Sequence, residues 1–598
     1  EISLGLVGSE MSIRDSKYCI LSIIISAALL AGCLSACGES GTATGGSSSD
    51  ENTAATVTGG DAATTPDTTA DVEAPDVSGA ITIALSGQSA TTTGTGAEVT
   101  DGMVTITAGG TYVVTGTMTE GRILVNAPKE EVTLVLQDVS ITCSTGSPLY
   151  VYKSRATTLY LPEGTASTLT DGTDYTFSDS YSSAEEEEPN ACLYSKSDLV
   201  IAGSGSLTVN ANYNNGITGK DTLFIQKASV TVTAVNHGIN GKDSLTIKDA
   251  DITVTSGGDA LRSTNDSDTT LGYLVITGSA LKLTAGEDGI QAETTLTISG
   301  GTATVTTAGG AGQSISDDTS AKGLKAGTQV TVTGGTFQLN CCDDAIHSNG
   351  DVTISGGSFT IATGDDGMHA DDTLSISSGT IDITRSYEGL EGAKVLISGG
   401  KISIVASDDG INAAGGSDQS GSGGFGFAPD AFGGSGDYLI RISGGVVTVN
   451  ASGDGIDSNG DIEVTGGELY ISGPTSNGDG TIDCDGSTTI TGGIVVAVGS
   501  TGMAENFGTA STQGSILVNL SGSAGQTITL KDSDGNILAR FTPAKAFGCV
   551  VVSAPGVAQG GTYTIAAGGA STTVTMESLI YGSGMGGFGG MGAPGNRG

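Results

Sequence analysis

Apolar and polar residues alternate with a period of two through most of the chain. The runs at 245–247, 252–254 and 296–298 read Leu-Thr-Ile, Ile-Thr-Val and Leu-Thr-Ile, and Ser-Gly-Gly or Thr-Gly-Gly turns follow such runs, as at 299–301 and 333–335. β-Branched residues in alternation between glycine turns are typical of short strands. No window of comparable length has the 3.6-residue period of a helix. The pattern therefore predicts an all-β protein.

A short phrase recurs between these strands: a polar or acidic residue, then Gly or Ala, then Ile, Leu or Met. Its central residues lie 22 positions apart at Gly216, Gly238 and Ala260, and again at Ala345, Gly367 and Gly389, with longer gaps that indicate loop insertions. One coil of about 22 residues with two or three short strands predicts a right-handed parallel β-helix, a solenoid that grows by adding coils. A left-handed hexapeptide helix is excluded because no period of six is present.

The ends of the chain differ from this repeat. Residues 80–506 are predicted to form the parallel β-helix, with irregular first coils up to about 185, and residues 507–580 a small C-terminal β cap. Residues 38–79 have the Gly, Ser and Thr composition of a flexible linker. Residues 581–598 form a Gly-rich tail.

Residues 1–37 are interpreted as upstream residues followed by a lipoprotein signal peptide. From Met11 a short basic region precedes an apolar stretch, 20–30, that is too short to span a bilayer, and Leu-Ala-Gly-Cys33 then resembles a bacterial lipobox. The alternative is an ordinary cleaved signal peptide with an incidental cysteine. The sequence thus predicts an extracellular lipoprotein, held at the cell surface through lipidated Cys33, whose contact with the membrane is confined to that anchor.

Composition narrows the possible partners. The formal net charge is −42, with 65 acidic and 23 basic residues, and Trp is absent. Nucleic acid and anionic lipid surfaces are therefore excluded as partners. The cysteines of the folded part have wide, irregular spacing, which favours buried free thiols over a disulfide framework.

The repeat stacks carboxylates. Equivalent residues of successive coils lie about 4.8 Å apart, so the acids of the phrase form columns that need counter-charge. Ca²⁺ held by carboxylate and amide oxygens is the predicted remedy. The alternative is that these acids are turn formers that face water. The candidate ligands are Asp221, Asp243, Asp259, Asn265, Asp266, Asp268, Asp288, Asp344, Asp366 and Asp409.

Two lysines, Lys220 and Lys242, stack in the same way, with Lys196 one coil earlier. Either could act as general base beside a calcium-neutralised uronate, as β-elimination requires. The simpler interpretation is Lys-Asp pairs that balance charge between coils.

The histidines allow two interpretations as well. His347 and His369 are 22 residues apart and should stack. They form either a soft-metal site with Cys341 or Cys342, or a pair of exposed turn residues.

Several segments resemble a known family. It is the secreted, cellulose-binding, polysaccharide-lyase-like β-helix family, carbohydrate-binding domain-containing proteins. The resemblance implies a pectate-lyase-like fold, bound calcium, and binding of cellulose and polygalacturonate more than cleavage. The segments that carry it are 188–191, 195–199, 214–221, 237–243, 258–263, 288–293, 532–537 and 541–545.

The expected function is calcium-assisted binding of plant cell-wall polysaccharide. The alternatives are a polysaccharide lyase that cleaves uronate-containing glycan and an adhesin or structural surface protein. Without Trp, stacking on sugar rings would fall to Tyr and Phe, such as those of the Gly/Phe-rich segment 415–436 or Phe588.

Overall fold

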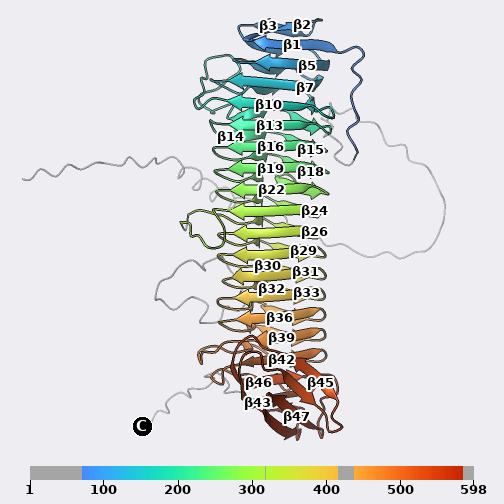
Figure 1. Ribbon diagram of the computed structural model, residues 1–598, viewed down its shortest axis with the longest axis vertical. Coiled ribbons are helices and arrows are strands. Elements are labelled where there is room, and N and C mark those ends of the chain that lie inside the picture. Colours follow the sequence, from blue (N-terminus) through green and yellow to red (C-terminus); the bar gives the residue numbers. More distant parts are fainter. Residues whose placement is uncertain (1–69, 317, 415–436, 583–598) are drawn as a thin grey trace, which may run out of the picture. The chain divides into compact units, whose positions relative to one another are not determined.

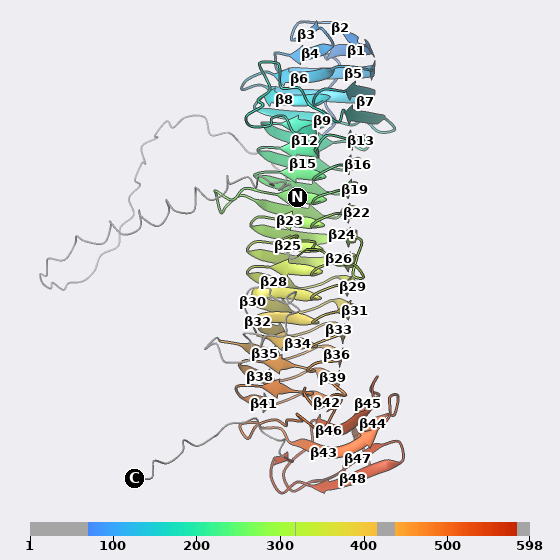
Figure 2. The ribbon, with the colours of Figure 1, turned by 90° about the vertical axis from the view of Figure 1, so that its left-hand side faces the viewer.

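A computed structural model describes residues 70–316, 318–414 and 437–582, all within the unit that spans residues 63–598. In these ranges every regular element is a β-strand, and the strands stack one above another along the chain (Figures 1 and 2). The all-β class and the parallel pairing predicted from the sequence are confirmed. The described residues include no helix long and apolar enough to cross a membrane.

Most strands fall into three parallel columns, in which each strand pairs with its equivalent one coil further on. Column A holds the short strands that carry the recurring phrase. They are β4 (Met103–Ile106), β6 (Arg122–Asn126), β8 (Leu149–Lys153), β11 (Ala191–Ser195), β14 (Asn215–Gly219), β17 (Ile239–Gly241), β20 (Leu261–Ser263), β23 (Ile290–Ala292), β25 (Leu324–Ala326), β27 (Ile346–Ser348), β30 (Met368–Ile376), β32 (Leu390–Ile397), β34 (Ile411–Ala413), β37 (Asp457–Ser458) and β40 (Asp483–Cys484).

Column B follows column A within each coil. It shares the later parts of β30 and β32, and its other strands are β9 (Ala156–Tyr160), β12 (Asp198–Ala202), β15 (Thr222–Gln226), β18 (Ser244–Lys248), β21 (Tyr273–Thr277), β24 (Thr295–Thr307), β26 (Gln329–Cys341), β28 (Asp351–Ile354), β35 (Leu439–Ile442), β38 (Asp461–Val464) and β41 (Thr488–Ile490).

Column C closes each coil. It shares the later parts of β24 and β26, and its other strands are β1 (Ile81–Gly87), β5 (Gly110–Met118), β7 (Glu131–Cys143), β10 (Ala166–Asp171), β13 (Ser206–Ala211), β16 (Ser229–Ala234), β19 (Asp251–Ser256), β22 (Ala280–Ala285), β29 (Ser358–Thr363), β31 (Thr380–Ser386), β33 (Lys401–Ala406), β36 (Val446–Ala451), β39 (Glu468–Ser472) and β42 (Ile494–Gly499).

Antiparallel strands occur at both ends of the stack. The short strands β2 (Ser89–Thr92) and β3 (Ala97–Thr100) pair with β1 and β4. After β42 come β46 (Phe547–Ser553) and β43 (Ser515–Gly522), with β49 (Ile580–Tyr581) at the edge. A separate four-stranded sheet contains β45 (Ile537–Phe541), β44 (Ile528–Lys531), β47 (Thr562–Ala567) and β48 (Ala570–Thr575).

The apolar residues of the alternating runs point into one continuous core. In column A, Ile217 pairs with Ile239 and Ile239 with Leu261, and all three are fully buried. The small residue before each is required by packing: a Cβ at Gly216 would clash with the Val232 side chain and the Gly238 carbonyl. The recurring phrase therefore reflects packing. Its Ile, Leu or Met fills the core, and the Gly or Ala before it leaves room for the next coil to approach.

Candidate functional site

The first residue of the recurring phrase forms a ladder of side-chain acceptors along column A. Its side chain accepts a hydrogen bond from the backbone N–H of the equivalent residue one coil on: Asp344 Oδ1 from Asp366 at 3.0 Å, and Asp366 Oδ1 from Glu388 at 3.2 Å. The other rungs run from His237 to Asn215, Asp259 to His237, Asp288 to Asp259, Lys322 to Asp288, Asp454 to Asp409 and Gly480 to Asp454. The acidic residues of the repeat thus satisfy backbone donors between coils.

These acids do not face water. Asp344 is 0% exposed and Asp366 1%, while Asp259 and Asp288 are also buried. The interpretation of the acids as solvated turn formers is therefore wrong for these positions, because each side chain folds back over the next coil instead of projecting outward. Counter-charge is needed here, as the sequence analysis expected.

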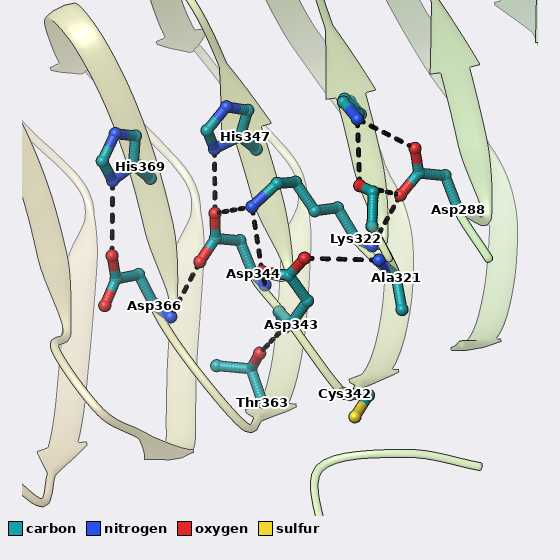
Figure 3. Close-up of polar contacts among 12 residues, drawn as sticks. Asp288, Ala321, Lys322, Cys342, Asp343, Asp344, His347, Thr363, Asp366 and His369 are labelled. Atoms are coloured by element: carbon teal, nitrogen blue, oxygen red, sulfur yellow. Dashed lines mark hydrogen bonds and ion pairs between the residues drawn. The ribbon is translucent and has the colours of Figure 1, made fainter. Parts of the chain in front are cut away.

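In the coils up to residue 347 that counter-charge comes from basic side chains. Arg262 lies 3.1 Å from Asp259, Lys325 lies 3.2 Å from Asp288, and Lys322 lies 2.7 Å from Asp344 (Figure 3). Burial opposes ionisation of Asp344, but Lys322 and His347 hold its pKa well below the usual range. Three of the proposed calcium ligands are thus already paired with cations.

Asp366 still contacts His369 at 3.3 Å, but the ladder acids that follow it lack such partners within the described ranges. Among the described residues, no Lys, Arg or His forms an ion pair with Glu388, Asp409 or Asp454. Burial and the neighbouring Asp408 and Asp457 raise the pKa of Asp409 to about 8. Burial and Asp409 raise the pKa of Asp454 to about 9. Along column A, the ladder carboxylates therefore change from ones with a basic partner to ones without a basic partner among the described residues.

Asp409, Asp454 and Asp457 place three carboxylate oxygens within 4.8 Å of one another. Asn412, which is 7% exposed and pairs in register with Asp457, has a side-chain oxygen without a partner among the described residues. Its amide nitrogen donates to Glu388 Oε1 at 3.2 Å, in the preceding coil. Oxygen ligands of this kind suit a hard cation.

The earlier candidate ligands form a second column beside the ladder. Asn265 Nδ2 donates to Asp243 Oδ1 at 2.6 Å, and the Asp243 backbone N–H donates to the Asp221 carbonyl. Burial, with Asp198 and Asp243 nearby, raises the pKa of Asp221 to about 6. Asp221, Asp243 and Asn265 thus follow one another in successive coils. The Asp268 backbone N–H donates to Asn265 Oδ1 at 3.0 Å, and the Asp268 carboxylate accepts hydrogen bonds from Thr270.

The stacked lysines do not pair with aspartates. Lys196 and Lys220 both contact Glu188, at 2.5 and 2.7 Å. Burial opposes ionisation of Glu188, but hydrogen bonds from the two lysines lower its pKa to about 2. The prediction of Lys-Asp pairs is therefore wrong for Lys220, because the loop that ends at Glu188 folds over this column. Lys242 makes no ion pair within the described ranges.

The histidine pair stacks as predicted but is not exposed. The rings of His347 and His369 are 4.9 Å apart and nearly parallel, and the residues are 4% and 1% exposed. The interpretation as exposed turn residues is wrong, since both imidazoles lie against the acidic ladder. Cys342 points away from both rings (Figure 3). All six cysteines of the described ranges are free, and all but Cys484 are buried.

One open groove lies on column A, over β20, β23 and β25. Its volume is about 480 Å³. Its wall includes three of the candidate calcium ligands, Asp259, Asp266 and Asp288. The other lining residues are Arg262, Thr264, Glu287, Gln291, Glu293, Asp318, Thr319, Ser320 and Lys325. None of these residues is aromatic, so the groove presents hydrogen-bonding and charged groups.

Sequence reasoning missed Arg262, Lys325, Glu391 and Asn412. Each lies three residues after the first residue of its phrase, and register pairing stacks this position along column A, as for Lys325 with His347 and Glu391 with Asn412. Reading this second position of the repeat would have found them.

Stacked coils that present polar side chains in register across an open groove define a class of binding protein suited to extended ligands. The chain belongs to the family described as carbohydrate-binding domain-containing protein, whose model matches residues 100–367 and 365–579. The predicted family is confirmed.

Two similar proteins were found. A carbohydrate-binding domain-containing protein of Acetivibrio thermocellus is 43% identical over 204 residues, which are 34% of this chain and 70% of that protein. A solved structure, the gadolinium derivative of a polysaccharide lyase-like protein from C. thermocellum, is 34% identical, covering 38% of this chain and 92% of that chain, with a TM-score of 0.37.

Proposed function

We propose that this protein binds plant cell-wall polysaccharide, cellulose or pectin-type glycans or both, outside the cell and with the assistance of calcium. The observation that carries the proposal is the open polar groove on column A in a member of a carbohydrate-binding family. Its volume of about 480 Å³ falls in the range of small-molecule sites, roughly 300–1,000 Å³. An open groove accepts one or a few sugar residues of a longer chain.

The groove offers the groups that sugar hydroxyls need. Glu287 and Glu293 accept hydrogen bonds, and Arg262 has a buried Nε–H without a partner among the described residues. Because Asp259 and Asp288 hold Arg262 and Lys325 in place, these cations are positioned before a ligand arrives. Uronate carboxylates would meet the same two cations.

Calcium is assigned in this proposal to Asp409, Asp454 and Asp457, with the Asn412 amide oxygen as a further ligand. Asp409 and Asp454 form no ion pair with a basic side chain in the described ranges. Together with Asp457 they place oxygen ligands within 4.8 Å of one another, which suits the flexible coordination of Ca²⁺. Asp221, Asp243 and Asn265 are a second candidate set. The ion would hold adjacent coils of the stack together.

Binding is tested with the chain from residue 78 and two insoluble glycans, cellulose and calcium-gelled polygalacturonate. Glu287→Gln and Glu293→Gln, both half-buried in the groove, should each weaken retention by about tenfold, equivalent to roughly 1.4 kcal/mol. Asp251→Asn removes an equivalent charge from column C, outside the groove, and should bind normally. Unchanged binding by both groove variants would refute the proposed site.

The same incubation tests for cleavage. Lys242, which makes no ion pair in the described ranges, and Lys220, which is tied to Glu188, are the candidate bases of a lyase. Ultraviolet-absorbing unsaturated products that disappear in Lys242→Ala would make the protein a lyase. Binding without such products would support a binding protein that does not cleave its ligand. The absence of both binding and products would favour an adhesin.

We propose further that Cys33, outside the described residues, anchors the protein to the cell surface, and that the coils wind as a right-handed parallel β-helix with residues 507–580 as a cap. Right-handed connections between parallel strands are the rule in known folds. Cys33→Ser should release the chain from the membrane fraction of the producing cell into the medium. Continued membrane association would argue against lipidation.

A further inference from the structure

The stacked histidines lie in a cluster of imidazole nitrogens and carboxylate oxygens that are close enough to share a ligand. His369 Nδ1 lies 2.6 Å from Glu391 Oε2 and 3.3 Å from Asp366 Oδ2, and ligand atoms of these three residues lie within 4.8 Å of one another. His347 stacks on His369 from the preceding coil, and a ring nitrogen of each lies within 4.8 Å of the other, while His347 Nδ1 contacts Asp344 Oδ2 at 2.8 Å. The cluster therefore spans β27, β30 and β32.

The remaining ring nitrogens have the partners that metal-bound histidines usually have. His369 Nε2 contacts Asp371 Oδ1 at 3.1 Å, and His347 Nε2 contacts Asn349 Oδ1 at 2.9 Å. A carboxylate or amide oxygen on the far nitrogen fixes the ring and leaves the near nitrogen as a ligand. In Figure 3 the near nitrogens of both rings face the acidic ladder.

A second observation comes from Glu388, in the coil that carries Glu391. Its Oε2 is buried and has no hydrogen-bond partner among the described residues, while its backbone N–H donates to Asp366. A buried carboxylate oxygen without a hydrogen-bond partner, in the coil that carries Glu391, is a group that a bound cation would satisfy.

We propose that His369, Asp366 and Glu391, with His347 from the adjacent coil, bind a first-row transition-metal dication such as Zn²⁺. Imidazole nitrogen with carboxylate oxygen is a ligand set of such ions, whereas calcium sites use oxygen alone. Tetrahedral coordination places ligand atoms about 3.3 Å apart, so closing on the ion needs side-chain shifts below about 1 Å. Asp344 is not a ligand, because Lys322 occupies its carboxylate.

The bound ion links three successive coils in the middle of the stack. In its absence a ring N–H of His369 donates to the carboxylates of Asp366 and Glu391. A metal ion takes the place of that ring proton, so metal uptake weakens at low pH. The site is independent of glycan binding, because the groove lies on earlier coils.

The test uses the full chain, freed of metal with a chelator and titrated with ZnCl₂ by calorimetry and with CoCl₂ by visible absorbance. We expect one saturable Zn²⁺ per chain that millimolar Ca²⁺ does not displace, and ligand-field bands for Co²⁺. His369→Gln should weaken Zn²⁺ binding by at least about a hundredfold and Glu391→Gln by at least about tenfold.

His237→Gln is the matched control. His237 occupies the ladder in an earlier coil, but Arg262 lies 2.7 Å from its ring nitrogen and bars a cation there. This variant should keep full Zn²⁺ affinity, and circular dichroism checks that every variant is folded. The proposal would be overturned if the parent chain showed no saturable Zn²⁺ binding or if Ca²⁺ displaced the Zn²⁺. It would also be overturned if His369→Gln and Glu391→Gln bound Zn²⁺ as tightly as the parent chain.

Discussion

Replacing Lys322 by Met is expected to destabilise the middle of the stack by about 3–5 kcal/mol, the cost of leaving a buried charge without its partner. Lys322 is 5% exposed, and its amine contacts Asp343 at 2.9 Å and Asp344 at 2.7 Å. Asp344 is fully buried, so water cannot replace the lost cation. Met keeps most of the side-chain volume, and the effect is therefore mainly electrostatic.

The measurement is the thermal midpoint together with amide hydrogen exchange in β25, β27 and β30, because stacked coils need not unfold as one unit. Adding Asp344→Asn to Lys322→Met removes the unpaired charge and should recover a large part of the loss. Lys401→Met alters an exposed lysine of column C and should change little. Equal destabilisation by Lys322→Met and Lys401→Met would show that the Lys322 ion pairs contribute nothing measurable.

The strands and their register follow from short-range information. Alternation with a period of two tells which residues enter the core, and a spacing of 22 tells which residues meet in the next coil, as Val230 meets Ile252. The pairing of Gln291 with Lys325 survives a longer gap because the extra residues form a loop outside the columns. Secondary structure and stacking were therefore accessible from the chain alone.

The environment of the stacked acids was not accessible in the same way. Asp344 and Asp409 occupy the same position of the repeat, yet Lys322 lies beside the first and another acid, Asp454, beside the second. What each carboxylate experiences depends on the residue one coil away and on loops such as the one that ends at Glu188. Burial of the ladder also depends on side-chain rotamers, which the repeat does not specify.

In the metal-free protein, stability should fall as the pH rises from 5 to 9. The folded chain holds the pKa of Asp409 near 8 and that of Asp454 near 9, against an ordinary value of 3.8. Over this range the folded state binds more protons than the unfolded chain, so unfolding releases protons and higher pH favours it. Groups with lowered pKa, such as Glu188 at about 2, stay ionised in this window and do not contribute.

The thermal midpoint with a chelator present should therefore drop by several degrees across this range, and Ca²⁺ should restore it most strongly near pH 9, where the ligands are ionised and binding adds to stability. Asp409→Asn with Asp454→Asn should flatten the pH dependence and abolish the calcium effect. Some slope remains, because burial and two nearby aspartates raise the pKa of Glu505 to about 7. The exposed-site variant Asp251→Asn should behave like the parent chain. A midpoint that rises with pH would show that these two carboxylates are not protonated at neutral pH. A calcium effect that survives the double substitution would show that they are not the ligands of the ion.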